Sequence, residues 1–400
     1  MNFISLQHLV FYIAITVTPL VAFSVFAFPM ETIAPVSEQF SRNSQATAVE
    51  LEPGGRILLA WARYGGTGTD HATNGIYQAY SDDGGRTWSE PFRLPTGQPR
   101  QNLGAASYQQ LDGRLLFGFW YRNGGNSSVM KVIESTDGGQ TWGEPRQILP
   151  ADGSSAAWLT ALNDSILTLN SGRLVWPLQT LTGVPNPPNE LGVIVARSDD
   201  GGQSWQTSPA MERISPEGGA RGYPYLPVLD QDQSTFHVPL KLHEPSVIQR
   251  KDGSLWMLVR STRGRFFESV SEDDGVTWTK IQPSSIESQT APPYLKRLSD
   301  GRMILIWNPV PEELKNRPWL PTSKRPTLAL AVSQDEGKTW SEPMVLAHDG
   351  GEHGFCYPNA LELTKTRELL VFATRSPEII YPGDLVMIRV PLEALLRGSP

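Results

Sequence analysis

One short motif occurs five times and constrains the fold of this chain more than any other feature. Its pattern is Ser-x-Asp-x-Gly-x-Ser/Thr-Trp, and successive copies begin 54, 63, 73 and 62 residues apart. Self-similarity of this kind along a chain indicates a repeat architecture. The five copies are Ser81–Trp88, Ser135–Trp142, Ser198–Trp205, Ser271–Trp278 and Ser333–Trp340.

The residue types of the motif predict a compact hairpin corner. An Asp side chain accepts hydrogen bonds from backbone N–H groups of its own turn, and Gly tolerates positive φ. The Trp that ends each copy is expected to pack inward beneath the corner, where its large apolar face is most useful.

Two strand-like runs recur around each copy of the motif. One run comes just before it, as in Ile76–Tyr80 and Val193–Ala196. A second lies further upstream and opens on Gly, as in Gly55–Leu59 and Gly253–Met257. Short strands separated by turn signals, with no helical pattern between them, favour an all-β fold. Repeated small sheets arranged radially form a β-propeller.

The five motifs resemble the Asp-boxes of the sialidase superfamily, whose fold is a six-bladed β-propeller. The resemblance covers roughly residues 40–395, and it implies a sixth blade at the tail without an Asp-box of its own. Strands of that blade are expected at Leu369–Ala373 and Leu385–Arg389. Asp-boxes lie at the blade periphery and also occur in propellers that bind rather than cleave, so we expect their residues to be structural.

The first residues predict a segment separate from the propeller. An apolar run from Leu9 to Phe28 carries almost no charge and is typical of a signal peptide or of an uncleaved membrane anchor. We therefore expect residues 1–28 to be that segment, 29–39 a linker and 40–397 the propeller. Either interpretation of the leader places the propeller outside the cytoplasm.

Composition excludes several classes of function. A net charge of −7 gives no basic surface for nucleic acid. Cys356 is the only cysteine, so no intrachain disulfide can form, and no Cys/His spacing suits zinc. A lone Cys is most often a buried small hydrophobe. We expect no metal and no organic cofactor, a monomer, a glycan as partner, and membrane contact only through an N-terminal anchor.

The resemblance to sialidases implies a particular chemistry. Their substrate carries a carboxylate at the reacting carbon, which would repel a carboxylate nucleophile. A neutral Tyr takes that role, and a neighbouring Glu accepts its proton. An Asp serves as acid and base. Three arginines hold the substrate carboxylate, because the planar guanidinium pairs bidentately and stays charged.

Five residues match positions of the family's machinery. Glu244 and Arg260 fit its Glu-then-Arg pair, with Glu as the partner of the nucleophile. Arg325, ahead of the fifth motif, resembles the third arginine. Tyr357, shortly after that motif, resembles the nucleophile. Asp70, in a Gly-rich loop before the first motif, resembles the acid/base.

The first half of the chain departs from the family pattern. The family's Arg-Ile-Pro motif supplies the first arginine, and the best register places Ser44 at that position. Arg42 lies two residues earlier, on the same face of a strand, and is the candidate for the same role. Arg63 resembles a secondary arginine that contacts substrate. Further polar residues considered as ligand contacts are His71, Asp164, Arg221 and His243.

These residues predict an extracytoplasmic retaining exo-glycosidase of the sialidase type that cleaves a terminal α-linked sialic acid or a related acidic sugar. One alternative is the same enzyme acting on a different sugar, uronic or neutral. Another is a carbohydrate-binding propeller without catalysis. A purely structural scaffold would leave the spacing of Glu244, Arg260, Arg325 and Tyr357 unexplained.

Overall fold

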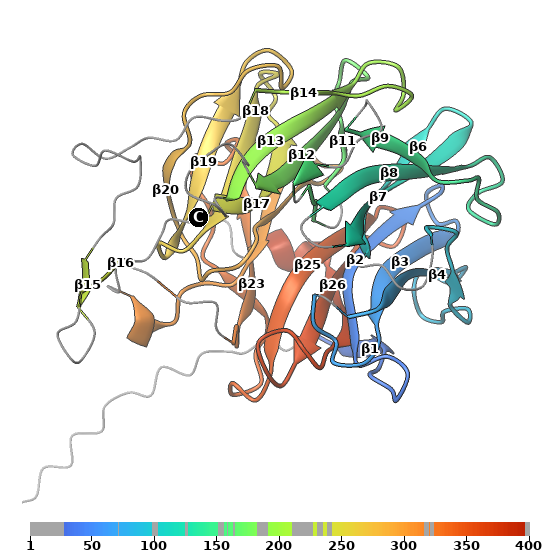
Figure 1. The fold of residues 1–400 in the computed structure, drawn as a ribbon. Coiled ribbons are helices and arrows are strands. Elements are labelled where there is room, and N and C mark those ends of the chain that lie inside the picture. The colour runs from blue at the N-terminus through green and yellow to red at the C-terminus, as the bar shows by residue number, and fades with distance from the viewer. Residues whose placement is uncertain are drawn as a thin grey trace, which may run out of the picture.

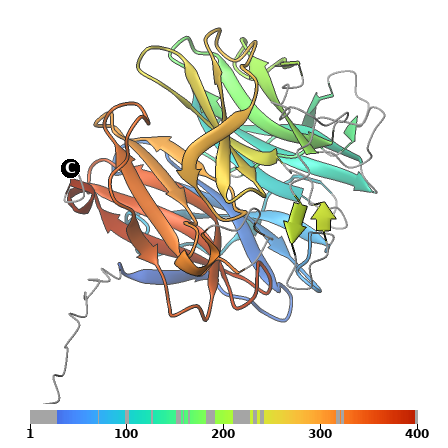
Figure 2. The same cartoon turned by 90° about the vertical axis from the view of Figure 1, so that its left-hand side faces the viewer.

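The strands form six radially arranged sheets, so the predicted all-β, six-bladed propeller is confirmed (Figures 1 and 2). The structure is a computed structural model. It describes residues 28–396 apart from residue 71 and the following further gaps: 98–102, 125–126, 151–155, 158, 163–164, 182–190, 210–226, 230–234, 238–241, 316–319 and 321–323.

The first three blades follow one another along the chain, and each is an antiparallel sheet. In every blade the strand nearest the axis comes first. Blade 1 contains β2 (Arg42–Glu50), β3 (Ile57–Tyr64), β4 (Asn74–Ser81) and β5 (Phe92–Arg93); blade 2 contains β6 (Leu103–Leu111), β7 (Arg114–Gly124), β8 (Ser127–Ser135) and β9 (Arg146–Leu149), with β10 (Ala156–Ala157) also on β8; blade 3 contains β11 (Leu167–Thr168), β12 (Leu174–Leu181), β13 (Leu191–Ser198) and β14 (Gln206–Thr207).

The second half repeats this plan after a small two-stranded ribbon of β15 (Pro227–Leu229) and β16 (Thr235–His237). Two 3-10 helices, η1 (Glu312–Leu314) and η2 (Leu392–Leu396), complete the described elements. Blade 4 contains β17 (Leu242–Gln249), β18 (Leu255–Ser261), β19 (Arg265–Ser271) and β20 (Gln282–Glu287); blade 5 contains β21 (Tyr294–Arg297), β22 (Met303–Trp307), β23 (Leu328–Ser333) and β24 (Met344–Ala347); blade 6 contains β25 (Gly354–Leu363), β26 (Glu368–Ser376) and β27 (Asp384–Pro391).

The outer strand of blade 6 comes from the other end of the chain. β1 (Met30–Ala34) pairs antiparallel with β27, and Met30 lies opposite Ile388. Residues 30–34 therefore form part of the propeller, although residues 29–39 were expected to be a linker. The expected leader was residues 1–28, and residues 1–27 lie outside the described part of the chain. Among the described residues, none of the helices has the length and apolar character needed to cross a membrane.

The core is a ring of six apolar clusters, each between two neighbouring blades. Side chains alternate along each strand, so successive residues of one sheet face the blade before and the blade after. Leu58 of β3, for example, packs towards blade 2, whereas Ile57 and Leu59 pack towards blade 6. Both faces of each blade are thus buried, which explains the nearly continuous apolar strands.

The Asp-boxes make the predicted corners. In the first box the Asp83 carboxylate accepts hydrogen bonds from the backbone N–H groups of Arg86 and Thr87, both at 2.9 Å, and from the Thr87 hydroxyl at 2.6 Å. The Ser81 hydroxyl donates to Asp83 at 2.8 Å and accepts from the Gly85 N–H. The five box tryptophans pack against five of the interblade clusters.

Each box also ties its blade to the preceding one. Arg389 of β27 donates to the Gly84 and Gly85 carbonyls of the first box. Arg114 of blade 2 likewise donates to Gly201 of the third box, and Arg197 of blade 3 to Gly275 of the fourth. Because these groups act on backbone and packing far from the axis, the boxes have the structural role expected of them.

Candidate active site

Three of the first strands carry the same backbone irregularity near the axis. The pairing register shifts at the start of β2, β17 and β25, and a residue with positive φ lies in each shift. These residues are Gln45 (φ 56°), Glu244 (φ 53°) and Tyr357 (φ 53°). Positive φ is unfavourable for residues other than Gly. Each bulge turns one side chain out of the ladder, and all three side chains line one pocket.

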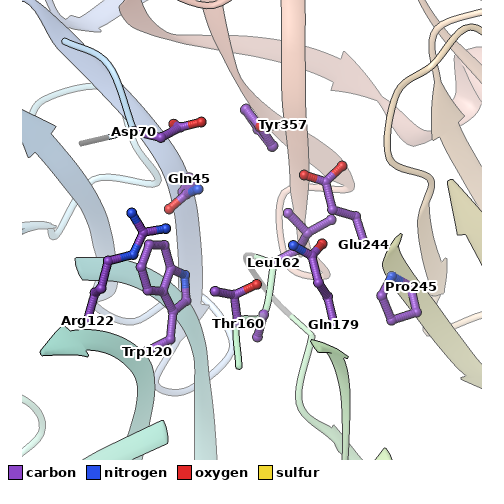
Figure 3. A pocket seen from close by; sticks show the side chains of 11 residues that line it. Gln45, Asp70, Trp120, Arg122, Thr160, Leu162, Gln179, Glu244, Pro245 and Tyr357 are labelled. Carbon is purple, nitrogen blue, oxygen red and sulfur yellow. The ribbon is translucent and has the colours of Figure 1, made fainter. Parts of the chain in front are cut away.

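The pocket lies at the centre of the propeller and encloses about 520 Å³ of space open to solvent. Strands of several blades contribute to it, as in other propellers and barrels whose sites lie where elements converge. In the view of Figure 3, Tyr357 lies between Asp70 and Glu244. The full lining is Gln45, Asp70, Trp120, Arg122, Thr160, Ala161, Leu162, Gln179, Glu244, Pro245 and Tyr357.

Arg42 reaches this site from β2. Its guanidinium is fully buried, donates to the Asp70 carboxylate at 2.7 Å and to the Gly68 carbonyl at 3.3 Å, and lies over the Tyr64 ring at 4.3 Å. Burial alone would lower the pKa of Arg42, but Tyr64 and Asp70 outweigh it and raise that pKa. Ser44 points at Arg42 instead of replacing it, at 3.5 Å. Arg42, the candidate for the role of the first arginine, thus lies beside Asp70, and Ser44 lies next to it.

Glu244, Arg260 and Tyr357 form one buried polar group. Arg260 makes a short ion pair with the Glu244 carboxylate and a side-chain hydrogen bond with Tyr357. Burial acts to lower the pKa of Arg260, but Glu244 and Tyr357 raise it overall. The pKa of Tyr357 is well above its usual value, first because the ring is buried and next because Glu244 is negative. The resting phenol is thus neutral and needs a base.

Arg325 is the third buried arginine near Tyr357. Its Nη2 donates to the Thr290 carbonyl at 2.8 Å, whereas Nε and Nη1 have no hydrogen-bond partner among the described residues. Burial, and next the charge of Arg260, lower its pKa. Buried N–H groups without partners are unfavourable. An anionic group entering the pocket would provide what this guanidinium lacks.

Arg63 packs against two aromatic rings. Its guanidinium is 4.0 Å from the Phe40 ring and 5.0 Å from the Tyr77 ring, and it is not among the residues that line the pocket. His243 is buried, and its Nε2 lies 3.9 Å from the Glu244 carboxylate. Three further candidates, His71, Asp164 and Arg221, lie outside the described residues.

Several lining residues were missed by sequence reasoning. One position recurs in blades 2, 3 and 4, where it holds Trp120, Gln179 and Arg260. It lies five residues after the residue that pairs with the first Ser of the blade's Asp-box. Counting from the Asp-boxes would therefore have pointed to Trp120 and Gln179. Gln45 had no such signal, since its bulge cannot be read from the sequence. Arg122 also lines the pocket, and burial lowers its pKa.

Cys356 is buried beside Tyr357 and Leu162, as expected of a lone apolar cysteine. Burial raises the pKa of its thiol, which does not favour a nucleophile. Within the part of the chain that the structure describes, no three His, Cys, Asp or Glu side chains are grouped to hold a metal ion.

Residues 55–368 match the BNR repeat-like domain, and the chain belongs to that family. A sialidase of Vibrio cholerae is 25% identical over 239 residues, which are 54% of this chain and 27% of the sialidase. The chain thus spans about a quarter of the length of that relative.

Solved structures share the fold. Trypanosoma rangeli sialidase in complex with sialic acid superposes with a TM-score of 0.65 at 14% identity, covering 92% of this chain and 59% of that one. A protein of unknown function from Dyadobacter fermentans gives a TM-score of 0.61 at 20% identity, covering 90% of this chain and 99% of that one. The propeller is therefore of the sialidase-like kind.

Proposed function

We propose that this protein is a retaining exo-glycosidase of the sialidase type, which removes a terminal α-linked sialic acid or a related acidic sugar. The observation that carries the proposal is that Asp70, Tyr357 and Glu244 line one pocket, with the buried Arg42 bonded to Asp70 and the buried Arg260 to Glu244. Two N–H groups of Arg325 without partners among the described residues suit a substrate carboxylate.

In the first step Asp70 protonates the departing glycosidic oxygen. The Tyr357 oxygen attacks the anomeric carbon as the bond to the leaving group breaks, and the phenol proton passes to Glu244. A glycosyl–tyrosine intermediate results. Water then attacks the same carbon as its bond to the Tyr357 oxygen breaks; Asp70 accepts the proton of that water, and Glu244 returns its proton to Tyr357. Arg42, Arg260 and Arg325 hold the carboxylate throughout.

The Asp70 carboxylate suits the role of acid and base, because its side chain is 57% accessible and can contact the leaving group on the solvent side of the pocket. Tyr357 suits the role of nucleophile, because its backbone bulge turns the side chain into the pocket between Asp70 and Glu244. The neutral state of Tyr357 at ordinary pH explains why a carboxylate must lie nearby.

The test is release of a fluorescent aryl group from an α-sialoside. Tyr357→Phe should lose at least about a thousandfold in kcat, a typical effect of removing a nucleophile, while binding of the sugar stays nearly unchanged. Tyr108→Phe is a matched control, since Tyr108 is also buried but lies in the cluster between blades 1 and 2. Near-normal turnover by Tyr357→Phe would refute the nucleophile.

Arg122 favours a second candidate, the same enzyme acting on a different sugar, uronic or neutral. It lines the pocket beside Trp120 and adds a guanidinium to the site besides Arg42, Arg260 and Arg325. A panel of uronic-acid and neutral aryl glycosides tests this candidate. Sugar binding without any turnover would instead indicate a non-catalytic carbohydrate-binding propeller.

The proposed setting is extracytoplasmic, which rests on the apolar run before Phe28. Fractionation of cells that express the full chain checks this location. We also propose that the protein acts as a monomer, and light scattering at several concentrations checks its mass.

A further inference from the structure

The loop between β26 and β27 exposes two large apolar side chains. Ile379 is 39% exposed and Tyr381 is 40% exposed. The residue between them, Ile380, faces the other way and packs against the buried group of Leu162, Cys356 and Tyr357. One short loop thus contacts the nucleophile's surroundings with one side chain and offers the neighbouring two to solvent.

This loop is fixed to the strand that carries Arg42. The Gly383 N–H donates to the Ser41 carbonyl at 3.1 Å, and the Asn43 N–H donates to the Gly383 carbonyl at 2.8 Å. At its end, Asp384 accepts hydrogen bonds from Arg375 at 2.8 Å and from the Val36 N–H at 2.9 Å. Ile379 and Tyr381 are therefore presented on an ordered support.

Tyr381 lies beside the loop that carries Asp70. A Cβ placed on Gly68 would lie only 3.4 Å from the Cβ of Tyr381, and the Gly68 carbonyl also accepts a hydrogen bond from Arg42. Asp70 follows two residues later. An exposed aromatic side chain thus flanks the carboxylate that, under the proposed function, meets the leaving group.

We propose that Tyr381 and Ile379 form a subsite for the leaving group, which takes the pyranose ring next to the cleaved bond with its apolar face against Tyr381. This inference rests on the proposed function. Tyrosine suits a sugar because it combines an apolar ring with a polar tip. Two side chains are far too small a surface for a protein partner, which needs roughly 800 Å² on each side.

The first experiment compares two substrates that differ only in the leaving group. An α-sialyl fluoride has no sugar to bind in the subsite, whereas an α-sialyl-lactose presents a galactose ring. Tyr381→Ala should lower kcat/KM for the trisaccharide about five- to tenfold, as expected for loss of one ring contact, and leave the fluoride within about twofold. Equal losses on both substrates would overturn the subsite.

Tyr80→Ala is the matched control, because Tyr80 is 37% exposed on β4 and stacks with Arg56. It should leave both substrates unaffected. Ile379→Ala is expected to act in the same direction as Tyr381→Ala with a smaller effect.

The second experiment needs no turnover. In saturation-transfer NMR with Tyr357→Phe protein and α-sialyl-lactose, the galactose protons should receive saturation, and this transfer should disappear in the Tyr357→Phe/Tyr381→Ala protein. A wild-type protein inactive on the fluoride would contradict the proposed hydrolysis. Galactose protons that show no Tyr381-dependent transfer would contradict the subsite, whatever the result for hydrolysis.

Discussion

Glu244 and Tyr357 share one backbone conformation although they lie 113 positions apart in different blades. Both have φ of 53°, both occupy the register shift of a blade's first strand, and both are followed by proline. A bulge re-aims a side chain and ends the local pairing, and a following proline has no N–H that would need a partner. The fold thus directs the proposed base and the proposed nucleophile to the pocket by the same local backbone conformation.

Arg260 and Arg325, two of the three buried arginines near Tyr357, should respond in opposite ways to replacement by methionine. Arg325→Met should raise the free energy of unfolding by about 1 kcal/mol, because it removes a buried charge with two N–H groups that lack partners among the described residues. Arg260→Met should lower it by about 3–5 kcal/mol, because the partly buried Glu244 loses its ion pair. Urea unfolding measures both. A destabilised Arg325→Met protein would show that Arg325 is structural rather than a binding group.

Gln45 should tolerate glycine better than alanine. With φ of 56° the residue occupies a region that is easy only for Gly. We expect Gln45→Gly to be about 1 kcal/mol more stable than Gln45→Ala, since both lose the same side-chain contacts apart from one methyl. At Ala48, in the regular part of β2, the order should reverse, with Ala48→Gly less stable than wild type. Thermal unfolding of the three variants measures these differences in stability.

The Asp-boxes should control stability in acid. Hydrogen bonds from Thr or Ser hydroxyls and backbone N–H groups of the corner lower the pKa of Asp137, Asp200 and Asp335 to about 2. The unfolded carboxyl, with pKa near 4, binds a proton first as pH falls. The stabilisation is therefore complete above about pH 4 and is lost as pH falls through about 2.

Asp200→Asn should consequently flatten the dependence of unfolding free energy on pH between about 4 and 2. Asp112→Asn, in the turn between β6 and β7, serves as the control and should leave the slope unchanged. Denaturant titrations at several pH values measure the slope. An Asp200→Asn slope equal to that of wild type would show that the corner does not couple protonation to folding.

Arg63 and Arg122 should separate stability from substrate binding. Arg63→Met should lower stability by about 1 kcal/mol through loss of its contacts with the Phe40 and Tyr77 rings, with KM within about twofold of wild type. Arg122→Met should raise KM several-fold, because Arg122 lines the pocket. Steady-state kinetics on one aryl glycoside measures both variants. A raised KM for Arg63→Met would instead show that Arg63 takes part in substrate binding.

The fold was predictable because its signals are local and repeated. Each Asp-box predicts its own hairpin corner, and the apolar runs before it predict the strands. Asp70, Glu244 and Tyr357 were predictable through the family pattern and do meet in one pocket. The bulge at Gln45, which shifts the pairing of β2 beside Ser44, could not be read from the sequence. Residue type alone also does not tell which face of β3 an arginine such as Arg63 occupies.

The pairing of β1 with β27 delays closure of the propeller while the chain is being synthesised. Met30 and its partner Ile388 lie 358 positions apart in the sequence. At 5–20 residues per second, roughly 18–72 s separate their synthesis. Until then the edge of β1 lacks its partner strand and can pair with other chains. The ring therefore closes only once β27 has been made.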